Sequence, residues 1–305
     1  MYYLRAYGQL VASELALPEF EPISNAQDTS LLQPDLRIKL RALPNVPIEE
    51  RNAGIFRVRD GVVDFEIADT VRIRVGSAEC IEVDLLDATR EREARLFVTG
   101  SAFGAWVFLT GRIPFHCGLV TKAGRGFAIT GPSGAGKSTL TTALVERGFG
   151  FMSDDVVVLD RAPEGAIAIT PSFPRIKLWG DAARHLRVHT KERHRLHRDL
   201  DKFHVPFSPA QVTEKATLGA VFRLRFDDGC TSPDCRRLPL PEAMRELRAN
   251  IYRPALVSAL GLEQNAFTLV ADILREVPVF EFVRPSDLTR LKASAEAFER
   301  VLADL

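Results

Sequence analysis

The nine residues from Gly131 to Thr139 constrain the fold of this chain more than any other stretch. They read Gly-Pro-Ser-Gly-Ala-Gly-Lys-Ser-Thr and fit the pattern G-x-x-x-x-G-K-[ST], in which backbone N–H groups turn inward around a polyphosphate. Glycines are needed there because side chains would obstruct that path. Residues 127–130 read as a short buried strand, and residues 140–147 as a helix that ends at Gly148. The sequence therefore predicts a strand, a phosphate-binding loop and a helix.

A helix N-terminus, a lysine and inward N–H groups would meet one anion at this loop. We expect Lys137 to hold the β- and γ-phosphates of a nucleotide and Ser138 to bind Mg²⁺. The nucleotide contacts predicted within the loop are Gly131, Ser133, Gly134, Ala135, Gly136, Lys137, Ser138 and Thr139.

Composition narrows the choice of partners. The 305 residues carry 40 Lys plus Arg and 40 Asp plus Glu, so no global charge favours nucleic acid or a membrane. The first residues lack the apolar core of a signal peptide, and no uncharged apolar run approaches the length of a membrane span. Four scattered cysteines do not suggest a disulfide framework. We expect a cytoplasmic protein without nucleic-acid or membrane partners.

Two parts of the chain differ in their hydrophobic pattern. Up to about residue 90, short alternating runs are separated by turn residues, and Asp60-Gly61 indicates a hairpin between 55–59 and 62–67. Between residues 91 and 110 the apolar spacing becomes helical. We predict an α/β (α+β) protein in which residues 1–98 form a small β-rich docking domain. Residues 99–305 would then form the domain that carries the phosphate loop.

A pair of carboxylates, Asp154-Asp155, follows the helix of the loop and precedes the apolar run 156–159. The strand after that helix should lie near the loop, so that one carboxylate could ligate Mg²⁺ and the other could accept a proton from a hydroxyl nucleophile. The run also resembles the Walker B strand of an ATPase, but Arg161 stands where a catalytic glutamate would be. Because no LSGGQ-like stretch occurs either, a transport ATPase is disfavoured.

Basic residues near the loop in sequence are further candidates. His116 precedes the hairpin that leads into the loop and could stand beside the γ-phosphate. Arg175 and Lys177 would share one face if this segment is a strand, and would meet either the phosphates or solvent.

A strongly basic run spans residues 184–198. Such a run is either a solvated segment or a basic lid over phosphates or an acidic peptide. Lys202 follows it and could contact the phosphates if the segment folds over the site. Arg284 is a weaker candidate of the same kind.

Together these motifs resemble a known family. His116 and Gly118, the loop, Arg147-Gly148 and Ser153-Asp154-Asp155 are similar in order and spacing to the catalytic domain of the HPr kinase/phosphorylase family. Here Cys117 stands between the histidine and the glycine, which are adjacent in that pattern. The wider chain looks more like the HPr-kinase-related proteins of peptide-modification clusters, including lasso-peptide precursor kinases; the residues that carry this likeness are Tyr7-Gly8, Ser13-Glu14-Leu15, Leu17-Pro18 and the stretch 174–179.

The resemblance implies a P-loop fold related to phosphoenolpyruvate carboxykinase. It also implies that the γ-phosphoryl group of ATP is transferred, with Mg²⁺, to a serine of a peptide or small protein such as a ribosomal peptide precursor. Two other functions stay open: an HPr(Ser) kinase/phosphorylase that regulates carbohydrate metabolism, and a nucleotide-binding switch that modifies no acceptor. A homo-oligomer is compatible with each of these.

The resemblance also implies roles for individual residues. Asp154 would be the base acting on the serine hydroxyl, and Asp155 and Ser138 would serve Mg²⁺, although two adjacent carboxylates could exchange these roles. The remaining expected contacts with the nucleotide are His116 and Lys137 at the transferred phosphate, and Arg175 and Lys202 beside it.

Overall fold

The structure is a computed structural model of the chain and describes residues 1–20, 23, 33–188, 195–197 and 200–305. It divides into two compact units. Unit 1 comprises Met1–Pro114, Pro171–Phe173 and Tyr252–Phe267, and unit 2 comprises Phe115–Thr170, Pro174–Ile251 and Thr268–Leu305. The chain first passes from unit 1 to unit 2 after Pro114, whereas the sequence analysis placed its boundary at residues 98/99. The docking role of the N-terminal part stays a prediction.

Unit 1 is built on a seven-stranded sheet in the order β1-β2-β3-β7-β6-β5-β4. Its strands are β1 (Tyr2–Ala6), β2 (Gln9–Ser13), β3 (Leu36–Leu40), β4 (Phe56–Arg59), β5 (Val62–Ile67), β6 (Val71–Ser77) and β7 (Cys80–Leu85). The hairpin predicted at Asp60-Gly61 is confirmed, because β4 and β5 pair antiparallel and both turn residues have positive φ. Strands β1 and β2 were not predicted from the sequence.

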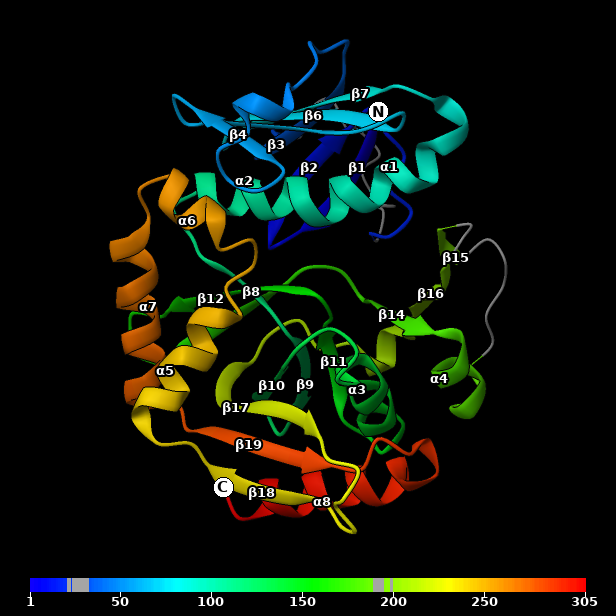
Figure 1. Ribbon diagram of the computed structural model, residues 1–305, viewed down its shortest axis with the longest axis vertical. Helices are drawn as coiled ribbons and strands as arrows, with labels where there is room; N and C mark the ends of the chain where they lie inside the picture. Colours follow the sequence, from blue (N-terminus) through cyan, green and yellow to red (C-terminus); the bar gives the residue numbers. More distant parts are fainter. Residues whose placement is uncertain (21–22, 24–32, 189–194, 198–199) are drawn as a thin grey trace. The chain divides into compact units, whose positions relative to one another are not determined.

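One helical segment crosses a face of this sheet (Figure 1). It consists of α1 (Glu91–Phe97), a π-helical turn η4 (Val98–Ala102) and α2 (Phe103–Leu109), which confirms the helix predicted between residues 91 and 110. Trp106 is almost fully buried, and its indole N–H donates to the carbonyl oxygen of Ala78 at 2.6 Å. Gly104 has no room for a side chain, since a Cβ atom there would lie 2.6 Å from the ring of Tyr252. Beside α2 packs α6 (Ala255–Ala259).

Unit 2 contains most of a nine-stranded sheet, in which β10, β17 and β19 run parallel side by side. The strands of this sheet are β8 (Pro114–His116), β9 (Gly118–Lys122), β10 (Arg125–Thr130), β11 (Gly150–Ser153), β12 (Val156–Arg161), β13 (Ile167–Pro171), β17 (Thr217–Phe226), β18 (Asp234–Arg237) and β19 (Val279–Arg284). A separate three-stranded sheet has the order β14-β16-β15, with β14 (Arg175–Trp179), β15 (Arg195–His197) and β16 (Leu200–Pro206).

Two helices of unit 2, α3 (Lys137–Glu146) and α8 (Leu291–Ala303), pack against each other and share a hydrophobic core with the central strands. Leu140 and Leu144 of α3 and Phe298 of α8 are fully buried in this core. The remaining helices are α4 (Gly180–His185), α5 (Leu240–Ala249) and α7 (Glu263–Glu276), with short 3-10 turns η2 (Ile48–Glu50), η3 (Ala88–Arg90), η6 (Pro209–Gln211) and η7 (Leu288–Arg290). The mixture of sheets and helices confirms the predicted α/β class.

Helices α6 and α7 are separate because the chain turns between them at Gly261, which has a φ of 69°. Strand β14 is followed directly by helix α4. Among the described residues, no helix is long and apolar enough to cross a membrane.

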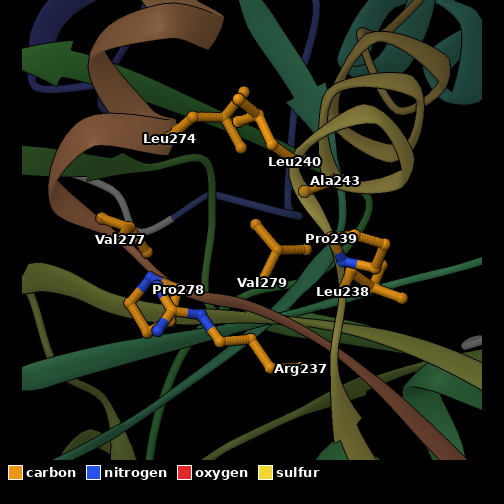
Figure 2. A pocket seen from close by; sticks show the side chains of 9 residues that line it. All are labelled: Arg237, Leu238, Pro239, Leu240, Ala243, Leu274, Val277, Pro278 and Val279. Atoms are coloured by element: carbon orange, nitrogen blue, oxygen red, sulfur yellow. The ribbon is translucent and has the colours of Figure 1, made fainter.

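Unit 2 also has a hollow of about 460 Å³ between α5, the end of α7 and the start of β19 (Figure 2). Its lining is mostly aliphatic, with Leu238, Leu240, Leu274 and Val279, and also includes the charged Arg237. None of the site residues predicted from the sequence lines it.

Candidate functional site

The loop predicted to bind phosphate connects β10 to the N-terminus of α3. Gly131, Gly134 and Gly136 all have positive φ, at 131°, 84° and 82°. Side-chain-bearing residues rarely adopt these conformations. Space is restricted as well, because a Cβ atom at Gly131 would lie 2.7 Å from the carbonyl oxygen of Leu224 on β17. The path of the backbone therefore favours glycine at all three positions, and the neighbouring strand excludes a side chain at Gly131 as well.

Lys137 is the first residue of α3, and its side chain folds back over the loop. The Lys137 ammonium donates to the carbonyl oxygens of Gly131 at 2.8 Å and of Pro132 at 3.2 Å. The residue is only 9% exposed, and burial lowers the pKa of Lys137, which Asp154 and Asp155 oppose. A cation is thus held against the loop, at the place where the motif needs one.

Asp154 lies in the turn between β11 and β12 and is 5% exposed. One carboxylate oxygen accepts a hydrogen bond from the Ser138 hydroxyl at 3.1 Å, and the other accepts one from the Lys177 backbone N–H at 3.0 Å. Burial raises the pKa of Asp154, although both hydrogen bonds act in the opposite direction. This carboxylate therefore has an increased affinity for a proton and lies beside the loop.

Asp155 occupies a different environment from its neighbour. Its φ of 82° is unusual for a residue with a side chain. Its carboxylate forms an ion pair with the Lys177 ammonium and lies 3.4 Å from Nε2 of His116. Burial alone would raise the pKa of Asp155, but the charge of Lys177 holds it well below its usual range. Asp155 is accordingly the carboxylate that stays ionised.

His116 ends strand β8, and its imidazole faces Asp155. Burial lowers the pKa of His116, and the positive charges of Lys137, Lys177 and Lys202 lower it further, whereas Asp155 opposes them. The imidazole is therefore neutral near pH 7 and can accept or donate a hydrogen bond.

Lys177 is also part of the site, although its contact with the acidic pair was not predicted from the sequence. It lies on β14, which pairs antiparallel with β16 so that Trp179 stands opposite Lys202. The Lys202 ammonium lies 5.3 Å from the centre of the Trp179 ring, and burial lowers the pKa of Lys202. The sequence indicated that Arg175 and Lys177 could share one face of a strand. Of these two residues, Lys177 makes the contact to Asp155.

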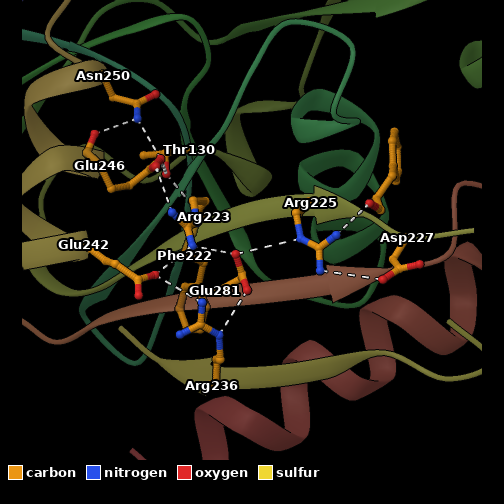
Figure 3. A network of polar contacts seen from close by, with 11 residues as sticks. Thr130, Phe222, Arg223, Arg225, Asp227, Arg236, Glu242, Glu246, Asn250 and Glu281 are labelled. Carbon is orange, nitrogen blue, oxygen red and sulfur yellow. Dashed lines mark hydrogen bonds and ion pairs between the residues drawn. The ribbon is translucent and has the colours of Figure 1, made fainter. Parts of the chain in front are cut away.

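Thr130, Glu246 and Asn250 belong to a polar network at the start of the loop (Figure 3). Thr130, the residue before the loop, donates to Glu246 of α5 at 2.7 Å, and the Asn250 side chain donates to the same carboxylate oxygen at 2.7 Å. The backbone oxygen of Asn250 accepts from the N–H of His116 at 2.7 Å. The network thus connects the start of the loop to the histidine, and nothing in the sequence motifs indicated it.

The structure thus brings Lys137, Ser138, Asp154, Asp155 and His116 together, with the charge of Lys202 close enough to affect both carboxylates. The sequence left the roles of Asp154 and Asp155 interchangeable. In the structure, Ser138 contacts Asp154 and not Asp155. The basic run 184–198 lies largely outside the described residues, which lack 189–194 and 198–199.

Comparison with known proteins found relatives of this chain. No protein-family model matches the chain. An HPr kinase/phosphorylase from Pelodictyon phaeoclathratiforme is 31% identical over 136 residues, which are 42% of this chain and 39% of that protein. Another from Chlorobium limicola is 42% identical over 53 residues, which are 17% of this chain and 16% of that protein. The resemblance indicated by the motifs is confirmed, while the matched part spans about two fifths or less of these relatives.

A solved structure was also found to be similar. The HPr(Ser) kinase/phosphatase from Coxiella burnetii matches with a TM-score of 0.33 and 14% identity, over 63% of this chain and 99% of that one. A superposition this loose carries no argument about function.

Proposed function

We propose that this HPr-kinase-like chain is an ATP- and Mg²⁺-dependent kinase that transfers the γ-phosphoryl group to a serine of a peptide or small protein. The observation that carries the proposal is the hydrogen bond between Ser138 of the loop and the buried carboxylate of Asp154. It brings a potential proton acceptor next to the residue that would meet the metal and the phosphates.

In this proposal the residues bind, neutralise charge and accept one proton. The N–H groups of the loop and Lys137 bind the polyphosphate, and Lys177 and Lys202 add positive charge beside it. The serine oxygen forms a bond to the γ-phosphorus as the bond from that phosphorus to the bridging oxygen breaks, and ADP leaves. The serine proton passes to Asp154, whose pKa is raised by burial.

The residues present also fit Mg²⁺. Within the described residues, no three His, Cys, Asp or Glu side chains form a metal-binding cluster. Mg²⁺, however, is commonly held by one or two protein oxygens together with substrate phosphates and water. Ser138 and the ionised Asp155 would supply such oxygens, with Asp154 close to Ser138. When bound, the metal would neutralise charge on the transferring phosphoryl group.

Two acceptors follow from different observations. The curated relatives are named HPr kinase/phosphorylase, which favours HPr as the acceptor and allows the reverse reaction as well. The residues near the N-terminus and the stretch 174–179 resemble kinases of peptide-modification clusters, which favours a ribosomal peptide precursor.

The test is incubation of the purified chain with ATP and Mg²⁺ and with each acceptor, followed by mass spectrometry. A phosphoserine on HPr or on the peptide identifies the acceptor. Asp154→Asn is the matched variant: it should retain ATP binding and lose transfer, whereas Asp155→Asn should weaken the response to Mg²⁺. Tight ATP binding without phosphorylation of any acceptor would instead support a nucleotide-binding switch and contradict the kinase proposal.

A further inference from the structure

Arg284 ends strand β19 at the same edge of the sheet as the phosphate loop. Strands β10, β17 and β19 are parallel neighbours, and Arg284 stands opposite Phe226, at the end of β17. The loop begins directly after β10. Ligands of α/β proteins commonly bind beyond the carboxyl ends of such parallel strands. Arg284 thus approaches the loop from a strand that is far from it in sequence.

The guanidinium of Arg284 is a buried charge. The residue is 0% exposed, its Nη1 donates to the carbonyl oxygen of Pro285 at 3.1 Å, and its Cζ atom lies 4.6 Å from the centre of the Phe226 ring. Among the described residues, no acceptor bonds to Nε or Nη2, and no carboxylate forms an ion pair with the group. Burial lowers the pKa of Arg284 to about 10. Such a charge is costly to fold without a counterion.

The free nitrogen of this arginine faces the loop. A Cβ atom at Gly136 would overlap Nη2 of Arg284 and would lie 2.9 Å from Phe226. Gly136 immediately precedes α3, a helix of 10 residues whose first N–H groups carry the positive end of the helix dipole. The unpaired cation therefore lies against the residue from which this helix begins.

We infer that Arg284 is an electrostatic positioning residue whose counterion is the polyphosphate bound by the loop. It fixes Gly136 by packing against it and adds an uncompensated positive charge behind the loop, without itself contacting the reacting atoms. The inference rests on the proposed polyphosphate site. Strand β19 thereby contributes to nucleotide affinity through a residue that is not part of the loop motif.

The first part of the test compares unfolding in the absence of ligand. Arg284→Met keeps an unbranched, apolar stem at this position and removes the charge, so its thermal midpoint should equal or exceed that of the wild type. Arg223→Met on neighbouring β17 is the control, because Arg223 pairs with the buried carboxylate of Glu281. That variant should unfold at a lower temperature. If Arg284→Met loses as much stability as Arg223→Met, Arg284 is a structural residue and the inference is wrong.

The second part measures the binding of two ligands, pyrophosphate and ATP with Mg²⁺. Binding of each is followed by the shift of the thermal unfolding midpoint and by calorimetry. We expect Arg284→Met to bind each about tenfold more weakly, which is the effect of one charge across a partly buried distance. Arg284→Lys should recover most of the affinity. Equal binding by wild type and Arg284→Met overturns the inference and leaves the site intact. Absence of binding by the wild type instead overturns the proposed site, and the inference with it.

Discussion

Lys177 connects the acidic pair to strand β14, and its replacement by methionine gives a prediction that follows directly from the geometry. The variant keeps the backbone N–H that donates to Asp154 but removes the ammonium that pairs with Asp155. The two side chains of the pair are 15% and 23% exposed, so the remaining carboxylate stays largely out of water. Among the described residues, the other close partner of this carboxylate is His116, at 3.4 Å, which is neutral near pH 7.

Removing one partner of a buried ion pair costs roughly 3–5 kcal/mol, and partial exposure reduces this to about 2–3 kcal/mol here. For a unit of this size that corresponds to a midpoint lower by roughly 5–10 °C at pH 7. Lys122→Met is the matched control. Its partner is Glu299, the two side chains are 45% and 30% exposed, and loss of such a surface pair should cost about 0.5 kcal/mol.

The pH dependence has a definite sign. The pKa of Asp155 is lower in the folded than in the unfolded chain, so its ion pair stabilises the fold above the ordinary carboxyl pKa of about 3.9 and ceases to do so as the pH falls toward the folded-state value. Calorimetry of both proteins from pH 7 to pH 3 should therefore show a difference that narrows below about pH 4. Equal losses in Lys177→Met and Lys122→Met at pH 7, or a difference independent of pH, would refute the reasoning.

Three further predictions concern neighbouring residues. An NMR titration should give His116 a pKa below its ordinary 6.5, because burial and three lysines disfavour the imidazolium. Lys177→Met should raise the pKa of His116. An unshifted pKa in the wild type would contradict this prediction. Asp155→Gly should be more stable than Asp155→Ala by about 1 kcal/mol in denaturant unfolding, because only glycine adopts its φ of 82° without strain; equal stabilities would exclude backbone strain. Glu246→Ala should lower the free energy of unfolding by about 2–4 kcal/mol, because Thr130 and Asn250 lose a buried acceptor, whereas Glu246→Gln should lower it less. Denaturant midpoints that do not separate these two variants would show that the network contributes little to stability.

The parts of the site that the sequence predicted are those encoded locally. The loop glycines, Lys137 and Ser138 are contiguous, and their positive φ values are properties of the glycines themselves. Asp154 reached the loop as expected because only one helix and one short strand separate it from Ser138. The hairpin at Asp60-Gly61 was predictable for the same reason, since a two-residue turn depends on its own residues.

The parts that the sequence did not predict depend on pairing between distant segments. Lys177 reaches Asp155 from 22 residues further along the chain, and Glu246 reaches Thr130 from 116 residues further along. Arg284 meets Gly136 because β19 pairs with β17, and β17 with β10. No spacing rule within one segment fixes such contacts. They follow from strand order and register, which only the folded chain shows.

Phosphoryl transfer to serine and ATP binding can be measured on the same two proteins. The purified chain and Asp154→Asn are incubated in parallel with Mg²⁺, ATP and the candidate acceptors, HPr and a precursor peptide, and the acceptors are analysed by mass spectrometry while ATP binding is measured by calorimetry. The account predicts one phosphoserine with the wild-type chain, none with Asp154→Asn, and similar ATP affinities for both. Full transfer by Asp154→Asn would contradict its role as the proton acceptor, and ATP binding by the wild type without a modified acceptor would contradict the kinase assignment itself.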